Sequence, residues 1–468
     1  MEGHKFMYEF IKHPKDREKL TAMGENAFDA AEEYLVRSPE WEVSANGVPM
    51  TVFAVPVTRG GLHSFVSLPF SENLNIKAVS RERKIESAQL SPASLNVGYT
   101  IEDNSISFCP PKAHHYCIQL NGGFHNALTV SVRPPVALVN PDARVFGEGF
   151  HLISTLDILS GGEIFISEGA VLKAVPPEDE TPLCDKDWAG KKNYRAVIEC
   201  HGAKNISIRG GGILDLSGLD WHARSPFCFV ECENLTVEGI TVVGSPSWNL
   251  IVHRCKNVYI NDVRLYGHRE NSDGIDIVSS ECVLVENCFI RTGDDAICVK
   301  AMSRPPVCGG RDITVRKCVV WNDKVRCYGI TSETRNDIDG VRFTDCDIIR
   351  SFADWTEEIG SLCVIVCDGG KISNIEFDDI RIEHEVQYVM NCQIMKDKWS
   401  SDSEIGGIDG VTFRNINAPA GVPSRFVGFD ETHKIKNVTV SEYHGKGIPA
   451  IGDFPVITEF TEKIAINK

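Results

Sequence analysis

The chain has 468 residues, enough for one large or two medium domains with an ample core. Its 48 Lys and Arg residues against 65 Asp and Glu residues give a formal net charge of −17, which argues against nucleic acid or an anionic membrane surface as a partner. No run of about 18 apolar residues occurs, so we expect no transmembrane span.

The N-terminal stretch, MEGHKFMYEFIKHPKDREKL, lacks the apolar segment of a secretory signal. We therefore expect a cytoplasmic protein, or a secreted one if a leader has been removed. Residues 21–38 (TAMGENAFDAAEEYLVRS) then show the spacing of a short amphipathic helix. Residues 1–40 are accordingly predicted to form a helical segment.

The next region, residues 41–140, is predicted to be a small antiparallel β-sandwich. It contains short apolar stretches separated by turn residues at intervals of roughly ten residues, which is typical of sandwich strands. These stretches are MTVFAVPV, HSFVSLPF, LNIKAV, SISFCPP, HYCIQL and ALTVSV. The prolines in VRPPVALVNP predict a linker near residues 134–141.

A repeat occupies the rest of the chain, with apolar residues at positions i, i+2, i+5 and i+7 of most copies. The copies begin at residues 206, 235, 258, 283, 313, 341, 375, 411 and 438. These intervals of 23 to 36 residues are too short for βαβ units, and no single copy can bury its apolar face alone. Residues 145–468 are therefore predicted to form a right-handed parallel β-helix within an all-β fold. Its inward-facing positions would be 235, 237, 258, 260, 283, 285, 313 and 315.

Three carboxylates are expected to meet on the outer face of this β-helix. The tripeptides DGI from residue 273, DAI from residue 295 and YGI from residue 328 match in successive coils. Since stacked strands lie about 4.7–4.9 Å apart, Asp273 and Asp295 should be neighbours, with Asp294 beside them and Tyr328 above. Repulsion between like charges should raise the pKa of one carboxyl group, as glycoside hydrolysis requires. A ladder of turn-capping aspartates or a calcium site would show the same spacing.

The stretches ENSDGIDIV (270–278) and TGDDAICVK (292–300) resemble the paired motif of glycoside hydrolase family 28, the polygalacturonases. SPSWNLIVH (245–253) resembles a further segment of that family, and the resemblance covers about residues 145–450. The related family of dextranases and isopullulanase has the same β-helix, and a preceding sandwich is more typical of that family.

The resemblance implies a role for each aspartate. Asp294 would be the general acid, while Asp273 and Asp295 would hold and deprotonate the attacking water. Members of the family invert anomeric configuration, for which acid and base ordinarily stand roughly 6.5–9.5 Å apart.

The sequence also departs from the polygalacturonases. Gly-His-Gly of that family is replaced by CYG at 327–329, and Arg-Ile-Lys, which grips a galacturonate carboxylate, is matched by VIV at 364–366. Loss of this clamp removes the charge-assisted contacts to a uronic acid, and the negative net charge would repel a polyanion. We therefore expect a neutral sugar as substrate. Galacturonides are the alternative, because Lys300, Arg326 and Arg335 could rebuild a cationic pocket.

The candidate substrate-binding residues lie near the aspartates in the coil register or in the adjacent loops. They are Tyr328, Lys300, Arg335, His268, Glu270, Asn271, Trp248 and Glu333, with Asp368 as a weaker candidate. Each has a structural alternative, because Tyr328 and Trp248 could be packing residues and the loop residues could simply face water.

The 17 cysteines are odd in number and include no CxxC pair, so they do not show the usual spacing of a zinc site. We expect no metal and no cofactor, and interpret the cysteines as reduced, buried side chains.

Two other functions fit a solenoid. A polysaccharide lyase would need calcium and a basic residue against an acidic sugar, and it would release an unsaturated product. A non-catalytic carbohydrate-binding solenoid would show no turnover. In every case the expected partner is an oligosaccharide or polysaccharide, and the sequence indicates no oligomeric state.

Overall fold

The computed structural model describes residues 36–177, 180–185, 191–353, 359–384, 386–397, 399–446 and 455–467. These residues belong to two compact units divided between Ala137 and Leu138. The predicted N-terminal helix lies almost wholly outside the described residues. Its expected end is not helical, because Val36–Arg37 form strand β1. The described residues include no helix that is long and apolar enough to cross a membrane.

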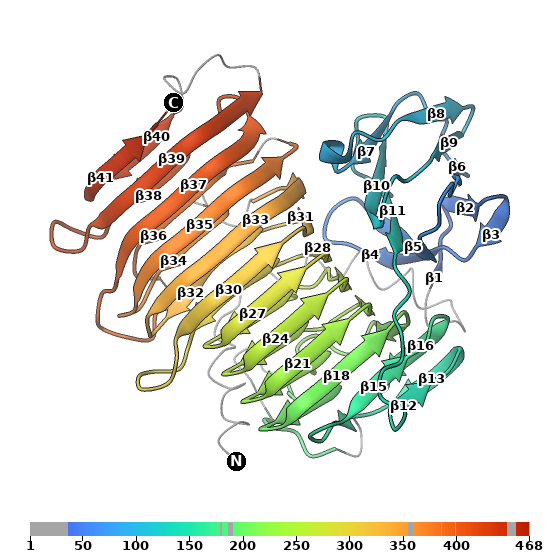
Figure 1. Ribbon diagram of the computed structural model, residues 1–468, viewed down its shortest axis with the longest axis horizontal. Helices are drawn as coiled ribbons and strands as arrows, with labels where there is room; N and C mark the ends of the chain where they lie inside the picture. The colour runs from blue at the N-terminus through green and yellow to red at the C-terminus, as the bar shows by residue number, and fades with distance from the viewer. Residues whose placement is uncertain are drawn as a thin grey trace. The chain divides into compact units, whose positions relative to one another are not determined.

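The first unit contains two small sheets that share one core (blue to teal in Figure 1). The first sheet has the order β1, β4 (Phe53–Pro56), β5 (Leu62–Pro69), β11 (Leu128–Arg133), β10 (His114–Leu120) and β7 (Ala88–Ser91). The second has the order β3 (Val48–Met50), β2 (Trp41–Ala45), β6 (Ile76–Ser80), β9 (Ser105–Phe108) and β8 (Tyr99–Glu102), and a single 3-10 turn spans Ala93–Leu95. The strands pair antiparallel except β5 and β11, which run parallel.

The second unit is a parallel β-helix, in which each coil adds strands beside those of the coil before it (green to red in Figure 1). We call its two sheets the long sheet and the cleft sheet. The long sheet contains β12 (Arg144–Phe146), β13 (Gly149–Ile153), β15 (Glu163–Ile166), β16 (Ala170–Ala174), β18 (Lys204–Gly210), β19 (Ile213–Asp215), β21 (Glu233–Glu238), β22 (Thr241–Val243), β24 (Lys256–Asn261), β25 (Arg264–Tyr266), β27 (Glu281–Glu286), β28 (Phe289–Thr292), β30 (Gly310–Arg316), β31 (Val319–Asn322), β33 (Ile338–Ser351), β35 (Lys371–Ile382), β37 (Gly407–Pro419), β39 (Ile435–Lys446) and β41 (Thr461–Ile466). The cleft sheet contains β14 (Leu156–Asp157), β17 (Ile198–His201), β20 (Phe227–Val230), β23 (Leu250–His253), β26 (Ile275–Val278), β29 (Ile297–Ala301), β32 (Tyr328–Thr334), β34 (Gly360–Val366), β36 (Tyr388–Ile394), β38 (Ser424–Val427) and β40 (Val456–Glu459).

One continuous apolar core fills the β-helix between the two sheets. The predicted inward positions are confirmed, because Leu235, Val258, Val283 and Ile313 pair in register and each is at most 2% exposed. Farther along, the rings of Phe343, Phe377 and Phe413 stack with centroids 4.9 and 5.0 Å apart. All 17 cysteines are free thiols, and most are buried.

Asparagines at successive corners turn the chain between coils. Asn205, Asn234 and Asn257 all have φ between 55° and 59°, a left-handed conformation that asparagine tolerates better than most residues. Their side chains also bond to one another, since Nδ2 of Asn234 donates to Oδ1 of Asn205 at 2.7 Å and Nδ2 of Asn257 donates to Oδ1 of Asn234 at 3.0 Å. The corners therefore fix the register that aligns the cleft sheet.

Candidate active site

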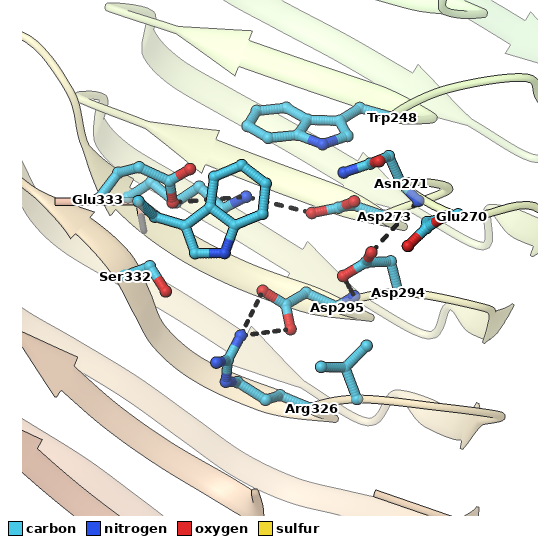
Figure 2. A pocket seen from close by; sticks show the side chains of 12 residues that line it. Trp248, Glu270, Asn271, Asp273, Asp294, Asp295, Arg326, Ser332 and Glu333 are labelled. Atoms are coloured by element: carbon cyan, nitrogen blue, oxygen red, sulfur yellow. Dashed lines mark hydrogen bonds and ion pairs between the residues drawn. The ribbon is translucent and has the colours of Figure 1, made fainter. Parts of the chain in front are cut away.

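A column of side chains runs along the entrance edge of the cleft sheet, one from each of four successive coils. Each of these side chains lies two residues before a residue of the cleft sheet, and those four residues pair with one another in register from coil to coil. Backbone hydrogen bonds extend the same register to the residues that precede the strands. The column consists of Trp248, Asp273, Asp295 and Arg326 (Figure 2). The corner at Gly274 requires a glycine, since a Cβ there would lie 2.2 Å from the carbonyl oxygen of Ala296.

The register corrects the prediction for Tyr328. It pairs with Ile297, so the place above Asp295 belongs to Arg326. Tyr328 is fully buried in the core, and its hydroxyl donates to the carbonyl oxygen of Cys318 at 3.0 Å. The predicted alignment of this coil was offset by two residues. Such an offset leaves the apolar pattern of a strand unchanged, because side chains alternate with a period of two. Tyr328 is a packing residue and not a substrate ligand.

A second correction concerns the valines that were aligned with a carboxylate clamp. Val364 and Val366 are fully buried among the inward-facing residues of the core. Both valines belong to strand β34, and the residues that alternate with them, Cys363, Ile365 and Cys367, form a separate apolar cluster. Because the two valines face the interior, their identity says nothing about a uronic acid, and that argument for a neutral sugar was wrong.

The cleft gathers side chains from five strands or their adjoining loops. Its lining residues are Trp248, Glu270, Asn271, Asp273, Asp294, Asp295, Lys300, Val325, Arg326, Ser332, Glu333 and Trp399 (Figure 2). Five of the predicted substrate-binding residues are among them: Trp248, Glu270, Asn271, Lys300 and Glu333. Tyr328, Arg335 and His268 are not.

The other predicted residues have structural contacts instead. Nη2 of Arg335 donates to Oγ of Ser401 at 2.5 Å. Burial and the charge of Arg269 lower the pKa of His268 to about 3, so its ring is neutral. Asp368 is fully buried, and its Oδ1 accepts hydrogen bonds from the backbone N–H groups of residues 401 and 402, which anchors the loop that follows Trp399.

The three aspartates differ in their partners. Oδ2 of Asp273 accepts from Nζ of Lys300 at 3.1 Å, and Asp295 receives Nη1 of Arg326 at 3.2 and 3.4 Å on its two oxygens. Asp294 has no cation within ion-pair distance among the described residues. It accepts backbone N–H groups instead, from residue 271 at 3.2 Å and from residue 295 at 2.9 Å.

The surroundings also raise the pKa of two of these carboxyl groups. Burial raises the pKa of Asp294, and the neighbouring Asp295 adds to this. The pKa of Asp273 is raised well above its ordinary value, mainly by burial, although Lys300 opposes the shift. Asp294 remains partly exposed, whereas Asp273 and Asp295 are 2% and 4% exposed. Asp294 is therefore the carboxyl group that a ligand can reach most readily.

The spacing of the aspartates is shorter than expected for an inverting enzyme. One oxygen from each of Asp273, Asp294 and Asp295 lies within 4.8 Å of the others, whereas the expected gap is roughly 6.5–9.5 Å. Oδ1 of Asp273 is also buried and accepts no hydrogen bond from a described residue, so it is a free acceptor within the cluster.

Two groups of side chains have oxygen or sulfur atoms close enough to surround a cation. They are Asp273, Asp294 and Asp295, and Asp273, Asp276 and Cys298. Protein cations already balance these charges, because Lys300 lies 3.1 Å from both Asp273 and Asp276 and Arg326 binds Asp295. The ammonium and guanidinium groups would repel a metal ion, so the cluster is better suited to ion pairing.

The sequence did not predict a role in the site for Asp276, Val325, Ser332 or Trp399. Arg326 was predicted only as one of three residues that could form a cationic pocket. Asp276 had a signal, since it is an acidic residue inside the apolar stretch GIDIV. Ser332 lies where the pairing of β29 with β32 shifts, a bulge that the pattern did not predict. Trp399 comes from a loop far along the chain, and no local pattern points to it.

Comparisons with known proteins identify the family of this chain. Residues 175–446 match Glycosyl hydrolases family 28. A polygalacturonase of Gossypium barbadense is 22% identical over 315 residues, which cover 61% of this chain and 70% of that protein. An exopolygalacturonase of Thermotoga maritima superposes with a TM-score of 0.56 and 19% identity, covering 69% of this chain and 84% of that one. A family 28 exopolygalacturonase of Yersinia enterocolitica superposes with a TM-score of 0.52 and 14% identity, covering 84% and 96%. Because the family match spans more than half of the sequence, the chain belongs to glycoside hydrolase family 28.

Proposed function

We propose that this chain hydrolyses galacturonide linkages by a single displacement, with Asp294 as the general acid. The observation that carries the proposal is the uneven pairing of the three aspartates. Lys300 pairs with Asp273 and lowers its pKa against the effect of burial, and Arg326 pairs with Asp295. Among the described residues, the Asp294 carboxyl group is bound only by backbone N–H groups.

In this reaction the Asp294 carboxyl group gives its proton to the glycosidic oxygen as the bond from that oxygen to the anomeric carbon breaks. A water molecule attacks the anomeric carbon and passes a proton to the Asp273–Asp295 pair. The free Oδ1 of Asp273 supports this role, because a buried carboxylate oxygen without a donor is costly and a water hydroxyl would satisfy it. After the products leave, the Asp273–Asp295 pair gives up the proton it took from water and Asp294 regains one from solvent, which restores the starting state.

The substrate class rests on the relatives, which are polygalacturonases. Within the cleft, Arg326 is the cation best placed to meet a sugar carboxylate, since its side chain is 20% exposed while that of Lys300 is 4% exposed. An arginine can hold a carboxylate through two parallel hydrogen bonds.

A neutral glycan is the second candidate, and the charge of the cleft favours it. Among the described residues, the lining includes five carboxyl groups, from Glu270, Asp273, Asp294, Asp295 and Glu333, but only two cations, Lys300 and Arg326. Each of these cations is already paired with an aspartate. A uronic acid would therefore have to compete with protein carboxylates.

A matched set of substrates separates the two candidates. Reducing-end release is measured on oligogalacturonides, on their methyl esters and on neutral α-linked oligosaccharides, with Asp294→Asn as the inactive control. If galacturonides are the substrate, the free acids should be cleaved at least about 10-fold faster than the esters, because the ester cannot form a charge-assisted pair. Faster cleavage of the neutral sugars would assign the second candidate, and no cleavage of any member would reject hydrolysis as the activity.

A further inference from the structure

One ammonium group in the cleft is shared by several carboxylates. Nζ of Lys300 lies 3.1 Å from Asp273 Oδ2, 3.1 Å from Asp276 Oδ1 and 3.8 Å from Glu333 Oε2. It also lies 3.7 Å from the centre of the Trp248 ring. Two of these carboxylates, Asp273 and Asp276, lie within hydrogen-bond distance of its N–H donors, and Glu333 lies within ion-pair distance.

This arrangement leaves Lys300 little access to a sugar. Its side chain is 4% exposed, and the indole ring of Trp248 covers it. Burial disfavours the charged amine, yet Asp276, Glu333 and the other neighbouring anions raise the pKa of Lys300 well above its ordinary value. The group therefore stays positive at every pH at which an enzyme would be assayed.

We propose that Lys300 is a positioning residue that stabilises the ionised form of Asp273, and that Asp276 and Glu333 weaken this effect by competing for the same ammonium group. The inference rests on the proposed hydrolase function, in which Asp273 accepts a proton from water. It assigns a role to Asp276, which does not line the cleft, and it replaces the substrate contact first expected of Lys300.

The electrostatic surroundings of Asp273 explain why it needs a cation. Burial raises its pKa, Lys300 lowers it, and the three neighbouring aspartates raise it again. Burial of a carboxyl group that is only 2% exposed favours its protonated form, which cannot accept a proton from water, and the positive charge of Lys300 opposes this effect. The charged and titratable groups that face the Lys300–Asp273 pair are Asp276, Glu333, Asp294, Asp295, Cys298 and, through Asp295, Arg326.

Two substitutions should move the acid limb of the kcat/KM profile in opposite directions. Lys300→Met removes the cation, so the pKa of Asp273 rises and the limb moves to higher pH. Asp276→Asn removes a competing anion, so the pKa of Asp273 falls and the limb moves to lower pH. A charge within about 4–6 Å typically shifts a carboxyl pKa by 1–3 units, so a displacement of about one pH unit is expected in each case.

Glu333→Gln should act in the same direction as Asp276→Asn but more weakly. Glu333 lies 3.8 Å from the ammonium group, whereas Asp276 lies 3.1 Å from it. Burial raises the pKa of both carboxyl groups to about 6, so both effects should be seen mainly at the upper end of the acid limb. A structural defect would not produce this ordered set of shifts.

Lys173→Met is the matched control. Lys173 also forms a buried pair with an aspartate, lying 3.0 Å from Asp215, and it does not line the cleft. Its side chain is 10% exposed and that of Asp215 is fully buried. Removing Lys173 should lower the melting temperature as removing Lys300 does, while the pH profile keeps its wild-type position.

A direct measurement separates this inference from the proposed function. Infrared spectra of protein with isotope-labelled aspartate report carboxyl protonation without turnover, and Asp273→Asn identifies the Asp273 band. The midpoint of that band should rise in Lys300→Met and fall in Asp276→Asn. Unchanged or parallel midpoints would reject the role of Lys300 even if the enzyme is active, whereas opposite shifts in a protein without hydrolase activity would reject only the proposed function.

Discussion

The guanidinium group of Arg326 binds both oxygens of the carboxylate of Asp295, which belongs to the preceding coil of the β-helix, at 3.2 and 3.4 Å. The two side chains are 20% and 5% exposed, so the pair is largely shielded from water. An arginine remains charged at any pH used for an assay. Asp295 therefore has a permanent cation beside it, and Asp294, its neighbour in sequence, has none among the described residues.

The first prediction follows from this pair. Arg326→Met leaves the nearly buried carboxylate of Asp295 without a partner, which should reduce kcat at least about 10-fold, since general base catalysis is typically worth 10²–10⁴-fold. Arg326→Lys restores the charge but not the planar donor group, so it should recover only part of the activity. The measurement is kcat for the wild type and both variants on the best substrate. Equal activity of the Met and Lys variants would show that the charge of Arg326 is not what matters.

The second prediction tests Asp294 as the proton donor. Asp294→Asn is nearly isosteric, so the fold should persist while protonation of the leaving oxygen is lost. On an unactivated glycoside kcat should fall by about 10²–10⁴-fold. A substrate with a good leaving group needs less protonation, so its rate should fall much less.

Asp273→Asn and Asp295→Asn provide the comparison for that experiment. Both remove carboxylates on the side that activates water, so they should slow activated and unactivated substrates alike. An equal loss on both substrates for Asp294→Asn would contradict its assignment as the acid. Full activity of that variant would exclude the whole site.

Much of the fold could be predicted from the sequence because a coil depends on local alternation of apolar residues. The apolar pattern predicted the inward face, and the structure buries the residues assigned to it, including Leu235, Val258, Val283 and Ile313. The parallel pairing of β5 with β11 was not predicted, since alternation is the same in parallel and antiparallel strands.

The candidate site was predicted less completely, for two physical reasons. The offset between coils is not visible in the apolar pattern, so Tyr328 was placed where Arg326 lies. Contacts made by distant loops are not local either, so Trp399 gave no signal. Asp273, Asp294 and Asp295 were found because they lie within two residues of well-patterned strands, where the register is least ambiguous.

The third prediction concerns Tyr328 as a packing residue. Tyr328→Phe removes a buried hydroxyl that donates to the carbonyl oxygen of Cys318, and the ring can keep its place beside Phe343, 5.8 Å away between centroids. The loss of one hydrogen bond should cost about 0.5–1.5 kcal/mol of unfolding free energy. Denaturant unfolding measures this cost, and kcat should stay within about two-fold of the wild type, since the ring makes no contribution to the cleft lining. A large loss of kcat with normal stability would show instead that the Tyr328 hydroxyl group contributes to substrate binding or catalysis.

The last prediction is that hydrolysis inverts the anomeric configuration. The distances alone point the other way, because carboxyl oxygens within 4.8 Å are nearer to the roughly 5–5.5 Å separation of retaining enzymes. Retention, however, requires an aspartate oxygen to bond to the anomeric carbon. Asp295 has both oxygens on Arg326, and Asp273 has one oxygen on Lys300 and is only 2% exposed, so neither is well placed to bond directly to a sugar. A water molecule is smaller, so it can be held by these oxygens and still attack the anomeric carbon.

Proton NMR of the first-formed product, recorded before mutarotation, should therefore show the anomer opposite to that of the substrate, and methanol should not be incorporated as a glycoside. A product of unchanged configuration, together with methyl glycoside formation, would replace the water-activating role of Asp273 and Asp295 with a covalent one.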